Sequence, residues 1–119
     1  MEERRKALRV KSTLTVQYCF DINSEQKKWD ISTAKNLSEN GVCFQTGKPF
    51  EVGSLIRLRF KIPSRPFELS EIDAKVICCH GVDQASTSVI RAEFSNPSEE
   101  IKGLLREYVL WTVKNQTLR

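Results

Sequence analysis

The sequence predicts a mainly β fold: a small antiparallel β-barrel of six or seven strands with one C-terminal α-helix. Three observations lead to this prediction. Residues 12–94 contain a series of short apolar segments with a period of two, the period of a strand with one buried face. Turn-forming residues separate these segments at regular intervals, as in small all-β domains. From Asn96 onward, the apolar period becomes that of an amphipathic helix.

Each expected strand has one apolar face, which we expect to point into the barrel. The clearest alternation lies in residues 54–62, where apolar and basic side chains alternate without a break. In residues 67–79, we expect the inner face to end with Val76 and Cys78. The other expected strands are residues 12–20, 29–36, 42–46 and 87–94. Barrels of this size fill their interior with side chains, so a functional site is expected on the outside.

Residues 97–115 are expected to form the helix. Asn96 is the expected N-cap, and Glu99 closes a capping box with it. Leu110 points away from the apolar stripe of this helix, and Trp111 lies at its flank. The stripe itself consists of Ile101, Leu104, Leu105, Tyr108, Val109 and Thr112.

Length and hydropathy indicate one domain that does not enter a membrane. A chain of 119 residues fits one domain and is large enough to bury a core. No apolar run approaches the roughly 18 residues that cross a bilayer. The N-terminal residues lead into no apolar segment of the kind that an export signal contains. We therefore expect a cytoplasmic protein.

The net charge of +4 is concentrated at the N-terminus. Residues 1–11 have a net charge of +3, and residues 12–119 carry the remaining +1. We therefore divide the chain into a basic arm, residues 1–11, and a barrel with its helix, residues 12–119. Such an arm suits a polyanionic partner, although composition alone favours a solvated terminus.

The cysteines and the histidine give no pattern of a metal or catalytic site. Without an export signal, the four cysteines are expected to be thiols, with Cys19 and Cys43 in the core. Cys78, Cys79 and His80 are adjacent, but neighbours on a strand point to opposite faces and do not converge on one ion. His80 has no recognisable nucleophile or orienting group beside it. We expect no metal, no cofactor and no enzymatic activity.

Two short motifs lie directly before expected strands. Arg5 and Arg9 form an RxxxR motif, and Asn36, Ser38 and Gly41 form an NxSxxG motif. Each is weak alone, because basic segments often contain the first and because Asn, Ser and Gly are ordinary turn residues. Together, in this order and at the start of strands of a small barrel, they are specific.

With these motifs, the chain resembles the PilZ domain family of bacterial receptors for cyclic di-GMP. The resemblance covers nearly the whole chain, since it includes the Val52–Gly53 turn, the late strand that ends in Ala92–Phe94 and the helix that starts at Pro97. The chain departs from the family in two places. Asn36 stands where many members have Asp, and residues 88–91 replace a Gly-Val-Gly-Val type of pattern.

The resemblance implies that the two motifs bind the ligand. Arg5 and Arg9 suit its phosphates and guanines, because guanidinium groups form bidentate contacts and stack on purines. The side-chain oxygens of Asn36 and Ser38 are expected to accept hydrogen bonds from a guanine edge. Gly41 is expected to adopt a positive φ and to let the backbone approach the ligand.

The number of ligands and the partner are further expectations from the resemblance. Some family members bind two intercalated ligand molecules, and a basic residue at the place of Arg4 resembles that group. Since the chain has no room for an effector domain, the signal is expected to pass, through ordering of the arm, to an unidentified protein partner. The chain itself is expected to be a monomer or a dimer.

Two alternatives remain open beside the receptor. One is a PilZ-like scaffold that binds proteins without nucleotide; the intact motifs argue against it. The other is a small barrel that binds RNA or single-stranded DNA through the outward face with Arg57, Arg59 and Lys61. Such barrels usually expose aromatic stacking platforms, which we do not expect on this face, and DNA is not an expected partner.

Overall fold

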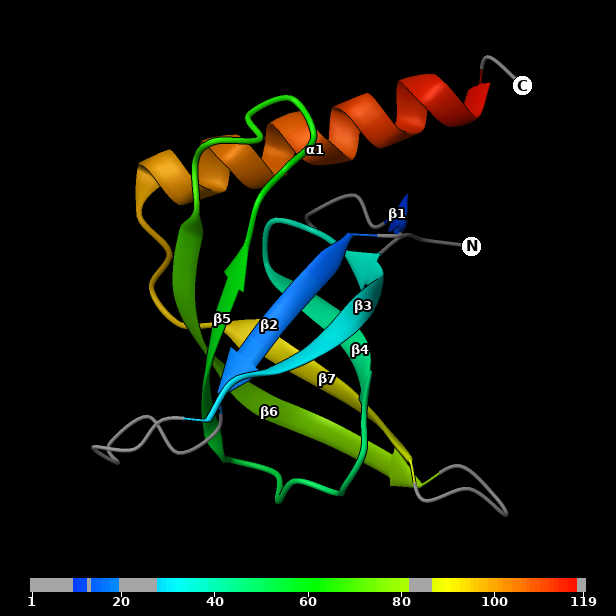
Figure 1. Ribbon diagram of the computed structural model, residues 1–119, viewed down its shortest axis with the longest axis vertical. Coiled ribbons are helices and arrows are strands. Elements are labelled where there is room, and N and C mark those ends of the chain that lie inside the picture. Colours follow the sequence, from blue (N-terminus) through cyan, green and yellow to red (C-terminus); the bar gives the residue numbers. More distant parts are fainter. Residues whose placement is uncertain (1–9, 13, 20–27, 82–86, 118–119) are drawn as a thin grey trace, which may run out of the picture.

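The computed structural model describes residues 10–12, 14–19, 28–81 and 87–117. In this part of the chain, six main strands form a closed antiparallel barrel, and one long helix lies across an end of it (Figure 1). The fold class predicted from the sequence is confirmed. The elements are β1 (Val10–Lys11), β2 (Thr15–Cys19), β3 (Asp30–Leu37), β4 (Gly41–Thr46), β5 (Leu55–Phe60), β6 (Ser70–Gly81), β7 (Ser88–Phe94) and α1 (Glu99–Thr117).

The sheet closes because its last strand returns to its beginning. The strand order is β1-β3-β2-β5-β6-β7-β4, and β4 also pairs with β3. Each main strand therefore has a neighbour on both sides, and closure of this kind removes the free edges at which other chains could pair. The short β1 lies beside β3 as an additional partner.

Apolar side chains fill the interior, as the alternation in the sequence predicts. Phe44, Ile56, Leu58 and Ile90 are among the largest side chains that are fully buried. The ring of Tyr18 packs on Phe44 with a centroid distance of 5.1 Å. Because these side chains occupy the barrel, its outer faces are left for binding.

A β-bulge in β6 reverses the predicted alternation. Val76 and Cys78 pair with adjacent residues of β7, so Ile77 is an extra residue in this strand. Cys79, rather than Cys78, packs against the core. The expectation that Cys78 continues the inner face is wrong, because the extra residue of a bulge inverts the faces of all residues that follow it.

The N-terminus of α1 also differs from the prediction. Ser98 Oγ accepts a hydrogen bond from the backbone N of Ile101 at 3.1 Å, so Ser98 is the N-cap and the helix begins at Glu99. Asn96, the predicted cap, has a φ of 42° and lies in the turn before the helix. The predicted apolar stripe faces the barrel, and Leu110 and Trp111 remain exposed.

Polar contacts attach the helix to the barrel. The hydroxyl groups of Tyr108 and Ser12 lie 2.9 Å apart. Glu107 accepts a hydrogen bond from Ser64 and forms an ion pair with Arg65 at 3.3 Å, which connects the helix to the loop between β5 and β6. No helix in the described part of the chain is long and apolar enough to span a membrane.

Candidate functional site

A second β-bulge turns Asn36 outward. Ala34 and Leu37 are both buried although they are three residues apart, and the register between β3 and β4 shifts between Ala34 and Asn36. With regular alternation, Asn36 would follow Ala34 into the core. The bulge instead places the Asn36 side chain, half-buried, on the outer face of the barrel.

The residues paired with Asn36 form a row across four strands. Asn36 pairs with Cys43 of β4, Cys43 with Arg91 of β7, and Arg91 with Cys78 of β6. Residues that are paired across strands share a face of the sheet. The row therefore places an amide, two thiols and a guanidinium on one outer surface.

Ser38 organises the turn between β3 and β4. Its hydroxyl oxygen accepts hydrogen bonds from the backbone N of Asn40 at 3.1 Å and of Gly41 at 3.3 Å. Its own backbone N donates to the carbonyl of Gly41 at 3.0 Å. Since both lone pairs of the hydroxyl are engaged, its free hydrogen-bonding capacity is that of a donor. The contact of Ser38 with a ligand stays a prediction, in which the hydroxyl acts as a donor rather than as the expected acceptor.

Gly41 is required by a close approach of two strands rather than by its φ. A Cβ at this position would lie 2.4 Å from the carbonyl oxygen of Ala92 in β7. Among the described glycines, only Gly53 has a positive φ. The predicted positive φ of Gly41 is wrong, because the residue already belongs to the extended strand β4.

These residues line one pocket on the outside of the barrel. It has a volume of about 110 Å³, and all three residues of the NxSxxG motif line it. Its far wall comes from β6 and β7. The residues that matter most for the chemistry are Asn36, Ser38, Gly41, Cys43, Arg91 and Glu93.

Arg91 is the pocket residue that the sequence reasoning missed. Its side chain is exposed, and no ion pair of Arg91 is found among the described residues. Other arginines are paired within the fold; Arg57, for example, lies 2.7 Å from Asp73, which raises the pKa of the guanidinium. In the sequence, only the departure from the family pattern at residues 88–91 draws attention to Arg91. Its position on the same face as Asn36 follows from the pairing of β7 with β4 and of β4 with β3.

The three arginines predicted in the arm, Arg4, Arg5 and Arg9, lie outside the described residues. The chain nevertheless continues from Arg9 directly into β1. There Val10 pairs with Leu37, and Lys11 pairs with Asn36.

The turn of the NxSxxG motif is also connected to the helix. Arg106 Nε lies 2.8 Å from a carboxylate oxygen of Glu39, and this ion pair raises the pKa of Arg106. The carbonyl of Asn40 accepts a hydrogen bond from the backbone N of Phe94 at 2.8 Å. The turn therefore contacts both β7 and α1.

The cysteines and the histidine remain outside any cluster of three ligands in the described residues. All four cysteines are free thiols. Cys78 Sγ lies 2.9 Å from His80 Nε2 on the outer face of β6. Cys19 and Cys43 are buried, as predicted, but Cys43 belongs to the outer face and lines the pocket rather than the core of the barrel.

Comparison with protein families identifies the domain. Residues 3–111 match the family described as PilZ domain. No curated protein matched the sequence.

Solved structures give the same fold. The inhibitor of motility (MotI/DgrA) of Bacillus subtilis superposes with a TM-score of 0.79 and 20% identity, over 96% of this chain and 53% of that one. The PilZ domain of YcgR from Escherichia coli, solved with c-di-GMP, superposes with a TM-score of 0.72 and 17% identity, over 96% of this chain and 95% of that one. MrkH of K. pneumonia, in a c-di-GMP complex, superposes with a TM-score of 0.69 and 14% identity, over 99% of this chain and 57% of that one. At these identities, the likeness concerns the fold alone.

Proposed function

Since the chain belongs to the PilZ domain family, we propose that it is a bacterial, cytoplasmic receptor for cyclic di-GMP. One observation carries the proposal: β1 pairs with Asn36 and Leu37, so the RxxxR motif leads directly into the NxSxxG motif. Two structural neighbours, from E. coli and K. pneumonia, were solved with this ligand, which supports the choice of ligand. PilZ domains are non-catalytic, and the chain is not an enzyme.

The arm supplies the positive groups. Five residues of extended chain span at most about 18 Å, so Arg5 and Arg9 both remain within reach of the pocket from the fixed position of Val10. Cyclic di-GMP has two phosphodiester charges and two guanines. Guanidinium groups bind phosphate oxygens or the O6 and N7 atoms of guanine in a bidentate manner and stack on the base, whereas an ammonium group offers only a point charge.

The barrel supplies the complementary polar groups. The amide oxygen of Asn36 accepts from the N1–H or the N2 amino group of a guanine. The hydroxyl group of Ser38, whose oxygen already accepts two backbone hydrogen bonds, donates to the ligand instead. Gly41, whose missing side chain lets β4 approach β7 closely, lines the pocket beside these groups.

Arg91 completes the site from the opposite wall. It is two strands away from Asn36 on the same outer face, and it has no ion-pair partner in the described part of the chain. A guanidinium that is not neutralised within the fold is available to a phosphate or a guanine. We therefore add Arg91 to the proposed ligand-binding residues.

The proposed output is a change in the arm that a protein partner recognises. Ligand contacts with Arg5 and Arg9 order the arm against β3, which is a common form of switching. Ser12, directly after β1, contacts Tyr108 of α1, and Glu39 of the motif turn contacts Arg106. These two contacts connect the proposed site to the helix, the element beside which we expect the partner to bind.

Calorimetric titration of cyclic di-GMP tests the proposal. The wild type is expected to bind, and Arg9→Ala is expected to lose about tenfold to a hundredfold in affinity, the usual size of a charge-assisted contact of about 1.5–3 kcal/mol. Lys61→Ala is the matched control and is expected to bind like the wild type. Lys61 is an exposed charge directly after β5, on the other side of the barrel. A wild-type chain that does not bind would instead support the nucleotide-free scaffold.

A further inference from the structure

A broad groove lies on the side of the barrel away from the proposed ligand site. It has a volume of about 630 Å³ and runs from the C-terminal half of α1 along the outer faces of β2 and β5. Its apolar lining includes Leu14, Ile31, Phe60, Leu69 and Trp111. None of its lining residues lines the pocket that contains Asn36 and Arg91.

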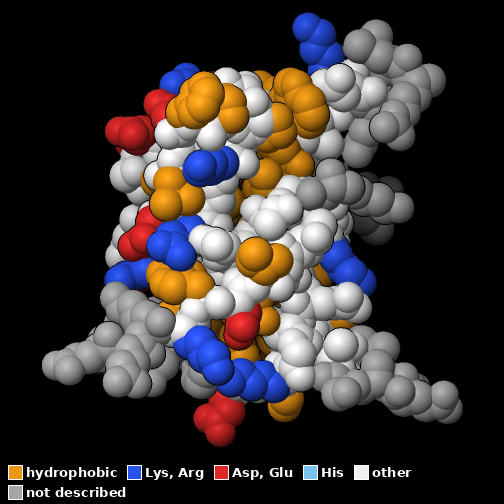
Figure 2. Space-filling model, in the orientation of Figure 1, with side chains coloured by type: hydrophobic (Ala, Val, Ile, Leu, Met, Phe, Trp, Pro, Cys, Tyr) orange, Lys and Arg blue, Asp and Glu red, His pale blue; other side chains and the backbone are white. Residues whose placement is uncertain are grey.

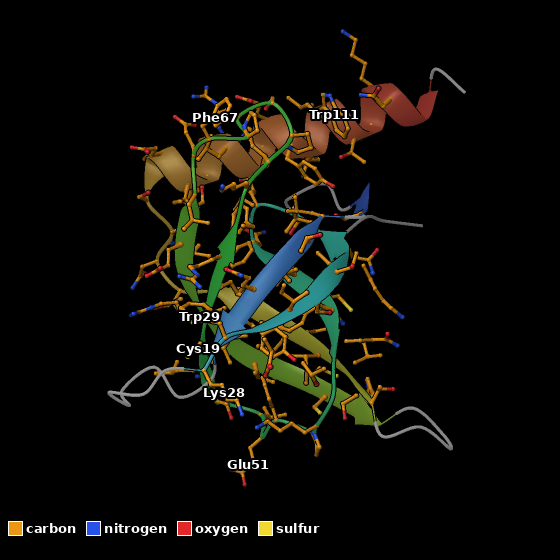
Figure 3. The ribbon with its side chains drawn as sticks, in the orientation of Figure 1. Cys19, Lys28, Trp29, Glu51, Phe67 and Trp111 are labelled. Carbon is orange, nitrogen blue, oxygen red and sulfur yellow. The ribbon has the colours of Figure 1, made fainter. Side chains whose placement is uncertain are left out.

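Three of the apolar side chains along this groove are exposed, whereas Leu14 and Phe60 are buried at its floor. Ile31 is 68% exposed, Leu69 54% and Trp111 43%. Figure 3 shows Trp111 on α1 and Phe67 on the neighbouring loop between β5 and β6. In Figure 2, hydrophobic side chains gather at the top of the view, the end of the molecule at which α1 lies. Exposed apolar side chains gathered along a groove mark a binding site on many proteins.

The charge of the groove is positive. Arg59 and Lys61 line it, and no carboxylate is found among the lining residues that the structure describes. The guanidinium of Arg59 stacks over the ring of Trp29 at 3.7 Å, which holds it in place. Its Nε atom is buried and has no hydrogen-bond acceptor among the described residues. Two cations beside the apolar side chains of the groove match carboxylates on an occupant.

We propose that this groove binds an amphipathic helix of a protein partner, with an apolar stripe flanked by Asp or Glu. The occupant is a helix because β2 and β5, which form the floor, already have strand neighbours on both sides. A strand added there would find no backbone N–H or C=O groups free to pair with it, whereas a helix forms its backbone hydrogen bonds internally. The proposal goes beyond the nucleotide site and does not depend on it.

Two other occupants fit the groove less well. A second copy of the chain offers α1, but this helix carries three acidic and three basic residues in the described part and has no acidic face to match Arg59 and Lys61. An oligonucleotide needs a continuous row of cations, yet Arg57, the next cation along β5, is already paired with Asp73.

Synthetic peptides of about 18 residues, or about five helical turns, test the proposal with the full-length protein. One peptide has a leucine stripe flanked by glutamates, the second has lysines in place of the glutamates, and a third carries a central proline that prevents the helix. We expect binding of the glutamate peptide alone, measured by fluorescence anisotropy. Equal binding of the glutamate and lysine peptides, or of the glutamate and proline peptides, or no binding of the glutamate peptide, would overturn the proposal.

Variants locate the binding on the molecule. Ile31→Glu is expected to lower the affinity for the glutamate peptide by about tenfold. Lys61→Glu is expected to lower this affinity similarly and to raise the affinity for the lysine peptide. Val52→Glu is the matched control, since Val52 is also 68% exposed but lies outside the groove. It is expected to leave affinity unchanged, and thermal unfolding verifies that each variant is folded.

Three results would reject the assignment of this occupant. If Val52→Glu lowers the affinity for the glutamate peptide as much as Ile31→Glu does, the groove is not the binding surface. If the free protein is a dimer that Ile31→Glu dissociates, the occupant is a second copy. If a single-stranded oligonucleotide binds and Lys61→Glu abolishes this binding, the groove serves nucleic acid instead.

Discussion

Replacement of Gly41 by alanine tests whether the ligand pocket depends on the close approach of β4 and β7. The added Cβ would lie 2.4 Å from the carbonyl oxygen of Ala92 and 3.4 Å from Cα of Glu93, and both are backbone atoms. Backbone atoms in a paired strand do not rotate away, so the two strands must separate. Overpacking of this kind typically costs about 1–3 kcal/mol. We expect a loss of about 2 kcal/mol in the free energy of unfolding.

Urea denaturation measures this loss, and thermal unfolding gives a second value. For a domain of this size, about 2 kcal/mol corresponds to a decrease in Tm of roughly 8 °C. Gly47→Ala is the matched control, because a Cβ at Gly47 meets no atom within 4 Å and its φ is not in the left-handed region. If Gly41→Ala is as stable as Gly47→Ala, the close approach of β4 and β7 does not require a glycine, and our account of this residue is wrong.

Three further substitutions test separate parts of the account. Arg91→Ala is expected to lower the affinity for cyclic di-GMP by about tenfold in calorimetry, since one charge-assisted contact is lost; an unchanged affinity would remove Arg91 from the site. Tyr108→Phe removes the hydrogen bond to Ser12 and is expected to cost about 1 kcal/mol in urea denaturation; no change would mean that this contact does not hold α1 to the barrel. Arg4→Leu is expected to reduce saturation from two ligands per chain to one at low salt, because two stacked ligands need a further cation; a wild-type ratio of one would contradict this.

The fold could be predicted because its main signal is periodic. The alternation in residues 54–62 and the helical stripe after Ser98 each repeat many times, so one irregular residue does not hide them. The errors occur where a single residue changes the backbone. The bulge at Ile77 exchanged the faces of Cys78 and Cys79, and periodicity alone gives no sign of such an insertion.

The candidate site could be predicted only in part, for a related reason. Asn36, Ser38 and Gly41 belong to one short motif, and a local pattern was enough to find them. Arg91 reaches the same pocket through the pairing of β4 with β7, and such long-range register is not encoded in any short segment. The positive φ predicted for Gly41 was wrong, and the hydrogen bonds of Ser38 within the turn were not predicted, because both depend on nearby backbone atoms rather than on residue type.

The most direct measurement of the central claim is an NMR titration of the 15N-labelled chain with cyclic di-GMP. The claim is that the two motifs meet beside β3 and hold the ligand on the outer face of β4 and β7. We expect the largest amide shifts at residues 36–41 and at Arg91, with new protection from exchange at residues 4–9, and little change at Ile31 or Lys61. The account is contradicted if saturating ligand leaves residues 36–41 and Arg91 unshifted, or if the shifts concentrate on β2 and β5.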